Sequence, residues 1–179
     1  MKHKKEEETV KEGNISLILD SYDDIFSDFD PRPYNVKALS DDFLSECKRA
    51  SADKNKELEL RFLVPRHKRK TNDEYEIRKR LRNHFQKHFK EKESEIKEIK
   101  RNGLTWFFIG AIVMIGATFL YKYEDFNFFF TFLLVMSEPA GWFFFWEGLD
   151  KVFIEAKKKK PDYEFYRKMN KARIYFIDY

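Results

Sequence analysis

The chain has 179 residues, a formal net charge of +4 and a single cysteine, Cys47. This length allows one compact module with an added segment and excludes two large domains. One cysteine excludes an internal disulfide framework and suits a reducing compartment. The content of 37% charged and 18% aromatic residues averages two unlike parts, so the distribution of charge is more informative than its sum.

The first third of the chain alternates between strand and helix signals. Residues 1–13 have mixed charge and are predicted to form a flexible tail. Strands are predicted at 15–19 and 57–64, where apolar residues run together or alternate and a proline ends the second run. A helix is predicted from Asp41 to about Ala52, because Ser40 can act as the N-cap before two acids.

A long amphipathic helix is predicted to begin near Asn72. Ile77, Leu81, Phe85 and Phe89 repeat at every fourth position, as one face of a helix does. Nothing breaks this pattern before residue 103, so we predict a nearly continuous helix of about 50 residues that runs into the apolar segment following it.

Two apolar stretches come next, Leu104–Tyr121 and Phe126–Gly148, with only four residues between them. The first contains no charged residue, and its 18 residues give about 27 Å of helix, close to the thickness of a hydrocarbon core. The second contains Glu138, whose cost in lipid the many surrounding Phe and Leu residues outweigh. The sequence therefore predicts a transmembrane helical hairpin.

The charges that flank the hairpin predict its orientation. Lys97, Lys100 and Arg101 precede the first stretch, and Lys157 to Lys160 follow the second, whereas the turn between the stretches has one Lys against two acids. Positively charged flanks remain on the cytoplasmic side. Both termini are therefore expected in the cytoplasm.

After the hairpin, a helix is predicted to continue to Lys160 and to end before Pro161, followed by a short helix at 163–170 and a third strand at 172–179. The predicted fold class is an α+β cytosolic domain with an inserted two-helix transmembrane hairpin. Its parts are a flexible tail (1–13), an α+β sensor part (14–71), a long basic helix (72–103), the hairpin (104–148) and a cytosolic helix and strand (149–179).

Glu138-Pro139-Ala140-Gly141 lies near the midpoint of the second stretch, where proline and glycine loosen a helix. An acid at this depth usually faces a bundle interior or a water-filled cavity. One hypothesis is a pore or gate lined by Glu138, with Pro139 and Gly141 at a kink and Glu147 at the mouth. The alternative is a protonated or hydrogen-bonded Glu138 that joins helices.

A single hairpin has too little interior to hold a pore, so conduction requires a homo-oligomer arranged around an axis. Gly110, Gly116 and Ala117 give the first stretch small faces for close helix packing. Their spacing does not match the GxxxG pattern, which makes this signal a weak one.

The segment DSYDDIFSDFDPRPY is an acidic run with no basic residue before Arg32. Its spacing does not match an EF-hand loop, and we predict no metal or other cofactor. The remaining interpretations are a solvated loop or an electronegative sensor surface. The sensor candidates are Asp20, Asp23, Asp24, Asp28 and Asp30.

Residues 66–101 contain 14 Lys/Arg against 7 Asp/Glu. Such a helix could touch anionic lipid headgroups. It could also bind nucleic acid or phosphate through the turn that precedes it, with Arg66, Lys68, Arg69 and Lys70 as candidates.

Catalytic signals are few. Arg82-Asn83 followed by His88 formally satisfies the Arg-Asn-x4-His pattern of HEPN ribonucleases, which act as paired copies. No nucleophile–base triad or glycine-rich phosphate loop occurs. We therefore assign no catalytic residues and do not expect an enzyme; a membrane-tethered ribonuclease that uses Arg82 and His88 is the alternative.

The strings SYDDIFSDFDPRPY, ELRFLVP and EPAGWFFFWEGLDK, together with the basic helix, resemble the membrane effector of the bacterial Hailong anti-phage system. The resemblance implies a tetrameric inner-membrane ion channel with an electronegative cytosolic sensor. It also implies that DNA oligomers made by a partner nucleotidyltransferase hold the channel closed, and that infection opens it and depolarises the cell. A looser likeness is to the small pore-forming accessory protein of CRISPR systems. A non-conducting membrane scaffold is the remaining alternative.

Overall fold

The structure is a computed structural model that describes residues 14–54, 58–123 and 128–179. The predicted tail, two of the four residues of the predicted turn (124 and 125) and the first two residues of the second apolar stretch (126 and 127) lie outside the described residues. The chain mixes helix and strand and divides into two compact units. The first unit comprises residues 1–90 and 163–179, and the second comprises residues 91–162.

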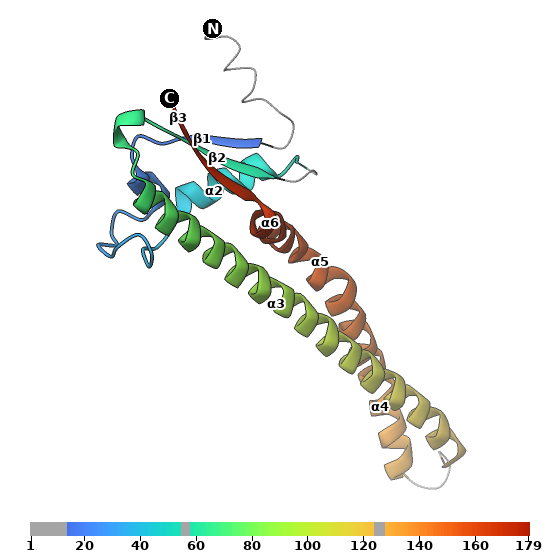
Figure 1. Ribbon diagram of the computed structural model, residues 1–179. Helices are drawn as coiled ribbons and strands as arrows, with labels where there is room; N and C mark the ends of the chain where they lie inside the picture. The colour runs from blue at the N-terminus through green and yellow to red at the C-terminus, as the bar shows by residue number, and fades with distance from the viewer. Residues whose placement is uncertain (1–13, 55–57, 124–127) are drawn as a thin grey trace. The chain divides into compact units, whose positions relative to one another are not determined.

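The first unit contains a three-stranded sheet of order β1-β2-β3, built from β1 (Asn14–Ile18), β2 (Glu59–Val64) and β3 (Arg173–Asp178) (Figure 1). The three predicted strands are confirmed. Both strand pairs are parallel, so each connection must cross over the sheet rather than turn back in a hairpin. The pairing of β2 with β3 brings the end of the chain into the same sheet as its beginning.

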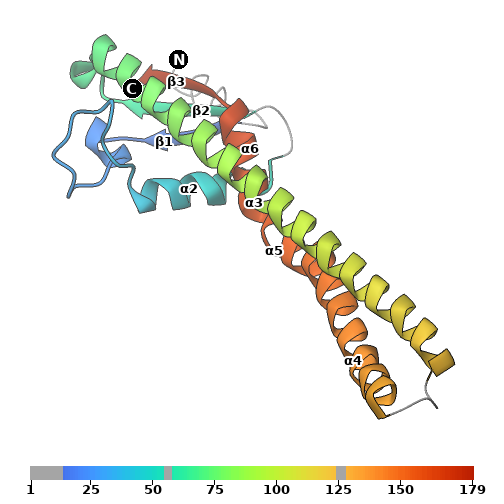
Figure 2. The same cartoon turned by 90° about the horizontal axis from the view of Figure 1, so that it is seen from below.

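Helices cover one face of this sheet (Figures 1 and 2). They are α2 (Asp41–Ser51), the first turns of α3 (Thr71–Leu120) and α6 (Lys160–Lys171). The buried core between helices and sheet combines apolar residues of all these elements, namely Ile15, Leu60, Phe62, Val64, Ile174 and Phe176 from the strands and Phe43, Cys47, Ile77, Leu81, Phe85, Phe165 and Met169 from the helices.

The second face of the sheet is more open. Ile18 and Tyr175 are 71% and 40% exposed, while Leu63 and Ile177 are half-buried. In the register of the sheet, Ile18, Leu63 and Ile177 form one apolar row across the three strands. This face is unusual because parallel sheets are normally covered on both sides.

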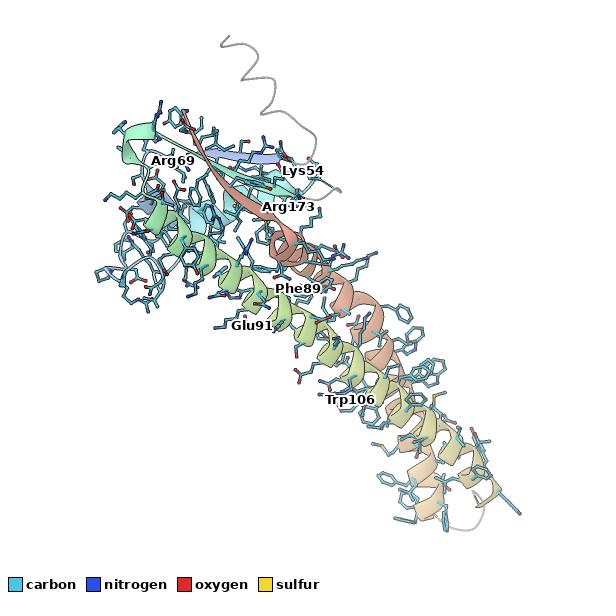
Figure 3. All side chains as sticks on the ribbon, viewed as in Figure 1. Lys54, Arg69, Phe89, Glu91, Trp106 and Arg173 are labelled. Carbon is cyan, nitrogen blue, oxygen red and sulfur yellow. The ribbon has the colours of Figure 1, made fainter. Side chains whose placement is uncertain are left out.

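The 50-residue α3 confirms the predicted long helix. Ile77, Leu81 and Phe85, spaced four apart, are at most 1% exposed and provide its core face. Phe89 continues this face and stacks near Tyr163 of α6, with ring centroids 5.6 Å apart (Figure 3). The spacing of four residues between these apolar side chains thus predicted both the helix and its buried side.

The last helices follow the prediction with one change. α4 (Phe128–Asp150) remains a single helix through Pro139, and a π-helical turn (Lys151–Glu155) and α5 (Ala156–Lys158) extend it. α6 starts three residues earlier than predicted and holds Pro161 in its first turn. Proline is well accommodated there, because first-turn amides have no partner within the helix.

Candidate functional site

Two helices are long and apolar enough to cross a membrane, as predicted. Their most apolar 18-residue windows have mean hydropathies of 2.0 in Thr71–Leu120 and 1.5 in Phe128–Lys158. Only 17% and 11% of those windows are buried within the structure. A core helix of a water-soluble protein buries its apolar side chains, whereas here Phe119 and Phe128 are 72% and 84% exposed. These surfaces therefore suit lipid or other subunits.

The two apolar helices approach each other at glycines. A Cβ atom added to Gly110 would lie 2.5 Å from the amide nitrogen of Phe145 and 2.8 Å from the carbonyl oxygen of Gly141. One added to Gly148 would lie 2.6 Å from the carbonyl oxygen of Gly103. Two facing glycine pairs, 103 with 148 and 110 with 141, therefore hold the backbones in contact.

These glycines are seven residues apart on each helix, and the buried Ala117 and Leu134 extend the same spacing. A seven-residue period keeps a stripe on one side of a pair of packed helices. The prediction that Gly116 belongs to the packing face was wrong, because a Cβ added there meets nothing within 4 Å. One residue of difference turns a helix position by about 100°, so Gly116 points away from the face of Ala117.

The predicted pore acid, Glu138, is exposed on the surface of this hairpin. Its Oε1 accepts a hydrogen bond of 2.7 Å from the hydroxyl of Tyr121, in the 3-10 turn Tyr121–Tyr123 that follows α3. Pro139 is also exposed and provides no backbone donor to α4. Gly141 is buried where α4 packs on α3.

Glu147, the predicted mouth residue, is part of a charged ladder at the end of α4. Its carboxylate lies 2.9 Å from the Nζ of Lys151, which is also 3.6 Å from Glu155. All three residues are spaced four apart along one helical stretch, where opposite charges are neighbours.

The acidic run is mostly engaged in local structure. Asp24 caps the 3-10 helix Tyr22–Ile25 and accepts from the backbone amides of Asp20 and Ser21 at 2.7 and 3.0 Å. Asp23 pairs with the Nζ of Lys37 at 2.7 Å. These contacts fold the first part of the acidic run into an ordered loop.

Asp30 organises the rest of that loop. Its two oxygens accept from the guanidinium of Arg32 at 2.8 Å each, and one also accepts from the amide of Ala38 at 2.6 Å. The bonds from Arg32 and Ala38 hold the pKa of Asp30 well below its usual range. Asp20 and Asp28, the remaining candidates, are exposed.

The basic residues of the predicted turn differ in the contacts that they make. Lys68 reaches the carbonyl oxygen of Asp20 at 2.8 Å, while Arg66 and Lys70 are exposed. Arg69, just before α3 (Figure 3), instead donates to Glu74 at 2.8 and 3.0 Å. Its guanidinium is therefore committed to the protein itself.

Glu74 is a buried acid, with only 5% of the residue exposed. Besides the two bonds from Arg69, its Oε1 accepts from the hydroxyl of Tyr22 at 3.0 Å, and that hydroxyl accepts from the amide of Lys70. Burial alone would raise the pKa of Glu74, but the bonds from Arg69 and Tyr22 outweigh it and lower the pKa. This network fixes the basic turn against the first turn of α3.

A cationic groove lies along the first turns of α3. It is an open cavity of about 330 Å³, lined by Tyr75, Arg78, Lys79, Arg82 and Asn83. These residues follow helical spacing and share one face. No acid lines the groove, and residues 75–90 as a whole carry six Lys/Arg against one acid. The sequence analysis predicted a basic helix, but it assigned the candidate phosphate-binding residues to the turn before that helix.

Two side chains in this groove are prepared for a ligand. Arg78 lines the groove, and its guanidinium lies 5.6 Å from the ring centre of Phe176. Tyr75 is 60% exposed and offers a flat ring at the edge of the groove. Guanidinium groups bind phosphate oxygens, and exposed aromatic rings stack on nucleobases.

The two residues of the HEPN-like pattern lie apart. Arg82 lines the groove, whereas His88 packs near His84 and Tyr166, with ring centroids 4.3 and 5.3 Å away. A separation of six residues turns a helix by roughly 600°, which places the two side chains about 120° apart. Burial, and next the neighbouring His88, lowers the pKa of His84 to about 4, so this imidazole is neutral at neutral pH.

No protein-family model, curated protein or solved structure matches the chain. Among the described residues, no three His, Cys, Asp or Glu side chains gather as metal ligands would. The function must therefore be argued from the hairpin, Glu138 and the cationic groove.

Proposed function

We propose that this chain is one subunit of a homo-oligomeric ion channel in a bacterial inner membrane, with both termini in the cytoplasm. The α+β unit gates the channel, and opening depolarises the membrane as an effector of anti-phage defence. The tetramer and the defence role follow the resemblance stated above. The argument for a channel comes from the hairpin itself.

The observation that carries the proposal is an exposed acid on a closed helix pair. The glycine contacts bring the backbones of α3 and α4 together, so one hairpin has no room for an ion path. Glu138 lies near the middle of α4 on the outside of that pair. Acids at membrane depth face a bundle interior or water. Several hairpins arranged around an axis would provide a bundle interior and a water-filled path, and Glu138 would line this path and favour cations.

The charges support the same orientation. Lys157 to Lys160 lie beyond the second apolar helix, and Lys97, Lys100 and Arg101 lie before the first. These cations are expected on the cytoplasmic side, among anionic headgroups. The sheet unit then lies in the cytoplasm, where a soluble ligand reaches it.

The cationic groove supports regulation by a phosphate-bearing ligand, a nucleotide or DNA oligomer. Its three cations match phosphate charges, and Tyr75 can stack on a base. We therefore propose the ligand site at residues 75–83 rather than on the acidic run, whose Asp23, Asp24 and Asp30 have partners within the protein. In this proposal the ligand holds the channel closed.

Purified protein in liposomes should pass cations across the membrane. Replacing Glu138 by Gln removes one charge per subunit from the path, and should reduce the preference for cations over anions by about tenfold. Reversal potentials in a salt gradient measure this ratio. Asp150→Asn, at the end of α4, is the control for the loss of an acid outside the proposed path.

Unchanged selectivity in E138Q would remove Glu138 from the path. If the wild-type protein inserts and oligomerises but never conducts, with or without nuclease treatment, the channel proposal fails and a membrane scaffold replaces it. Loss of activity in cells from His88→Ala, a change outside the groove, with conduction in liposomes intact, would favour the alternative of a membrane-tethered ribonuclease.

A second prediction concerns the binding of DNA in the groove. Single-stranded DNA should bind with an affinity that falls as salt rises, and Arg82→Ala should lower the slope of log K against log salt by about 0.7, the value for one phosphate contact. Replacing Arg78, Lys79 and Arg82 together should lower it by about 2. Fluorescence anisotropy of a labelled oligonucleotide at several salt concentrations provides the measurement.

Lys48→Ala on α2 is the matched control, because it removes the same charge from an exposed position outside the groove. It should leave the slope within error of the wild type. An unchanged slope in the triple variant would move the phosphate site away from the groove, with Arg66 and Lys70 as the next positions to test.

A further inference from the structure

A single side-chain hydrogen bond joins the end of the first apolar helix to the middle of the second. The hydroxyl of Tyr121 donates to Oε1 of Glu138 at 2.7 Å, across 17 positions of sequence. Among the described side chains of α4, Glu138 is the acid nearest to the middle of the helix. The bond therefore engages the same carboxylate that the proposed channel uses.

Helix geometry explains why these two residues meet. Gly110 packs on Gly141, which sets the two antiparallel helices level at that point. Moving from this point towards the turn between the helices, Tyr121 lies 11 residues beyond Gly110 and Glu138 lies 3 residues before Gly141. The two residues are therefore separated along the helix axis by about 12 Å, since each residue adds 1.5 Å. Side chains on helices lean towards the N-terminus, so the two long side chains lean towards each other and span this gap.

The bond satisfies Glu138 inside its own subunit. A carboxylate surrounded by apolar side chains is stabilised by a donor, and a phenol hydroxyl provides one without help from water, an ion or a second copy. A cation that passes Glu138 has to compete with that hydroxyl for Oε1. The bonded arrangement thus suits a resting channel better than a conducting one.

We propose that Tyr121 is a positioning residue that holds Glu138 in the closed channel, and that opening requires the Oη–Oε1 bond to break so that the carboxylate turns to the ion path. This inference rests on the proposed channel function. It adds the residue that keeps the acid away from the path, which neither the sequence pattern nor the resemblance identified.

The test is Tyr121→Phe, which removes the hydroxyl and keeps the ring. A hydrogen bond to a charged group shifts an equilibrium by roughly ten- to a hundredfold, so the open fraction of a mostly closed channel should rise about tenfold or more. Liposome flux and single-channel open probability in a planar bilayer measure it. Thr118→Val is the control, because its hydroxyl bonds only to its own helix at the carbonyl of Met114.

Two further variants separate a positioning role from a purely structural one. In a Glu138→Gln background, Tyr121→Phe should add little to the change that Glu138→Gln causes alone, because the hydroxyl acts through the carboxylate. An equal increase in both backgrounds would overturn the inference. So would a flux in Tyr121→Phe that is unchanged or lower than in the wild type.

Infrared spectroscopy provides a measurement that does not need conduction. The carboxyl bands of Glu138, isolated by subtracting the spectrum of Glu138→Gln, should shift in Tyr121→Phe and not in Thr118→Val. An unshifted band would show that the bond does not form, and would overturn the inference while leaving the channel proposal intact. A shifted band in a protein that never conducts would instead remove the proposed function, and the gating role of Tyr121 with it.

Discussion

Replacing Gly110 or Gly148 by alanine is expected to destabilise the hairpin. Each added Cβ would lie against the backbone of the facing helix, and backbone cannot move aside as a flexible side chain can. Overpacking of this kind costs about 1–3 kcal/mol. For a chain of this length the melting temperature should fall by about 2–12 °C, as measured by circular dichroism in detergent.

Alanine variants of Gly116 and Gly141 provide the comparison for this result. Gly116→Ala should be neutral or slightly stabilising, because its Cβ enters open space and alanine favours helix. Gly141→Ala should fall between these extremes, since the atom that its Cβ meets most closely, at 2.6 Å, is the Cγ of the Met114 side chain. Equal melting temperatures in all four variants would mean that the helices do not touch through their backbones.

Replacing Glu74 by alanine is expected to destabilise the sheet unit by about 3 kcal/mol, the lower end of the range for breaking a buried ion pair. The loss leaves Arg69 and the hydroxyl of Tyr22 without their shared acceptor. The lower end applies because 32% of the Arg69 side chain is exposed and can regain water. Chemical denaturation, monitored by far-ultraviolet circular dichroism, provides the measurement.

The same network predicts a pH dependence. The pKa of Glu74 is lowered in the folded protein, so its contribution to stability is full above the unfolded pKa of about 4.3 and is lost as pH falls through the folded pKa below it. The stability difference between wild type and Glu74→Gln should therefore be largest near neutral pH and shrink towards pH 3. Glu98→Gln, at an exposed position on α3, should give no such convergence.

Local pattern predicted most of the secondary structure. The spacing of Ile77, Leu81 and Phe85 was enough to identify the core face of α3, because a helix repeats every 3.6 residues whatever it packs against. The alternation in 59–64 likewise predicted a strand whose every second residue is buried. The sequence could not predict that the sheet is parallel with β2 in the centre, because that pairing joins segments more than 100 residues apart.

The candidate site was predicted less completely. Glu138 was identified because an acid within an apolar stretch is conspicuous, but its partner Tyr121 lies on another helix and carries no local signal. Gly116 was assigned to a packing face because it is small, whereas contact within the hairpin depends on the seven-residue period shared with the facing helix. The groove was missed because its lining residues, spread over nine positions, become neighbours only on a folded helix.

Taken alone, the sequence determined the elements of this protein. The lengths of the two apolar helices, the core face of α3 and the strands all follow from periodicity and hydrophobicity, which act over a few residues. Only the tertiary structure decided which charges are free to act. Arg69, Asp23 and Asp30 have partners within the protein, while Arg78, Lys79 and Arg82 line one open groove, since the pairing of charges depends on distances in space that a charge pattern does not contain.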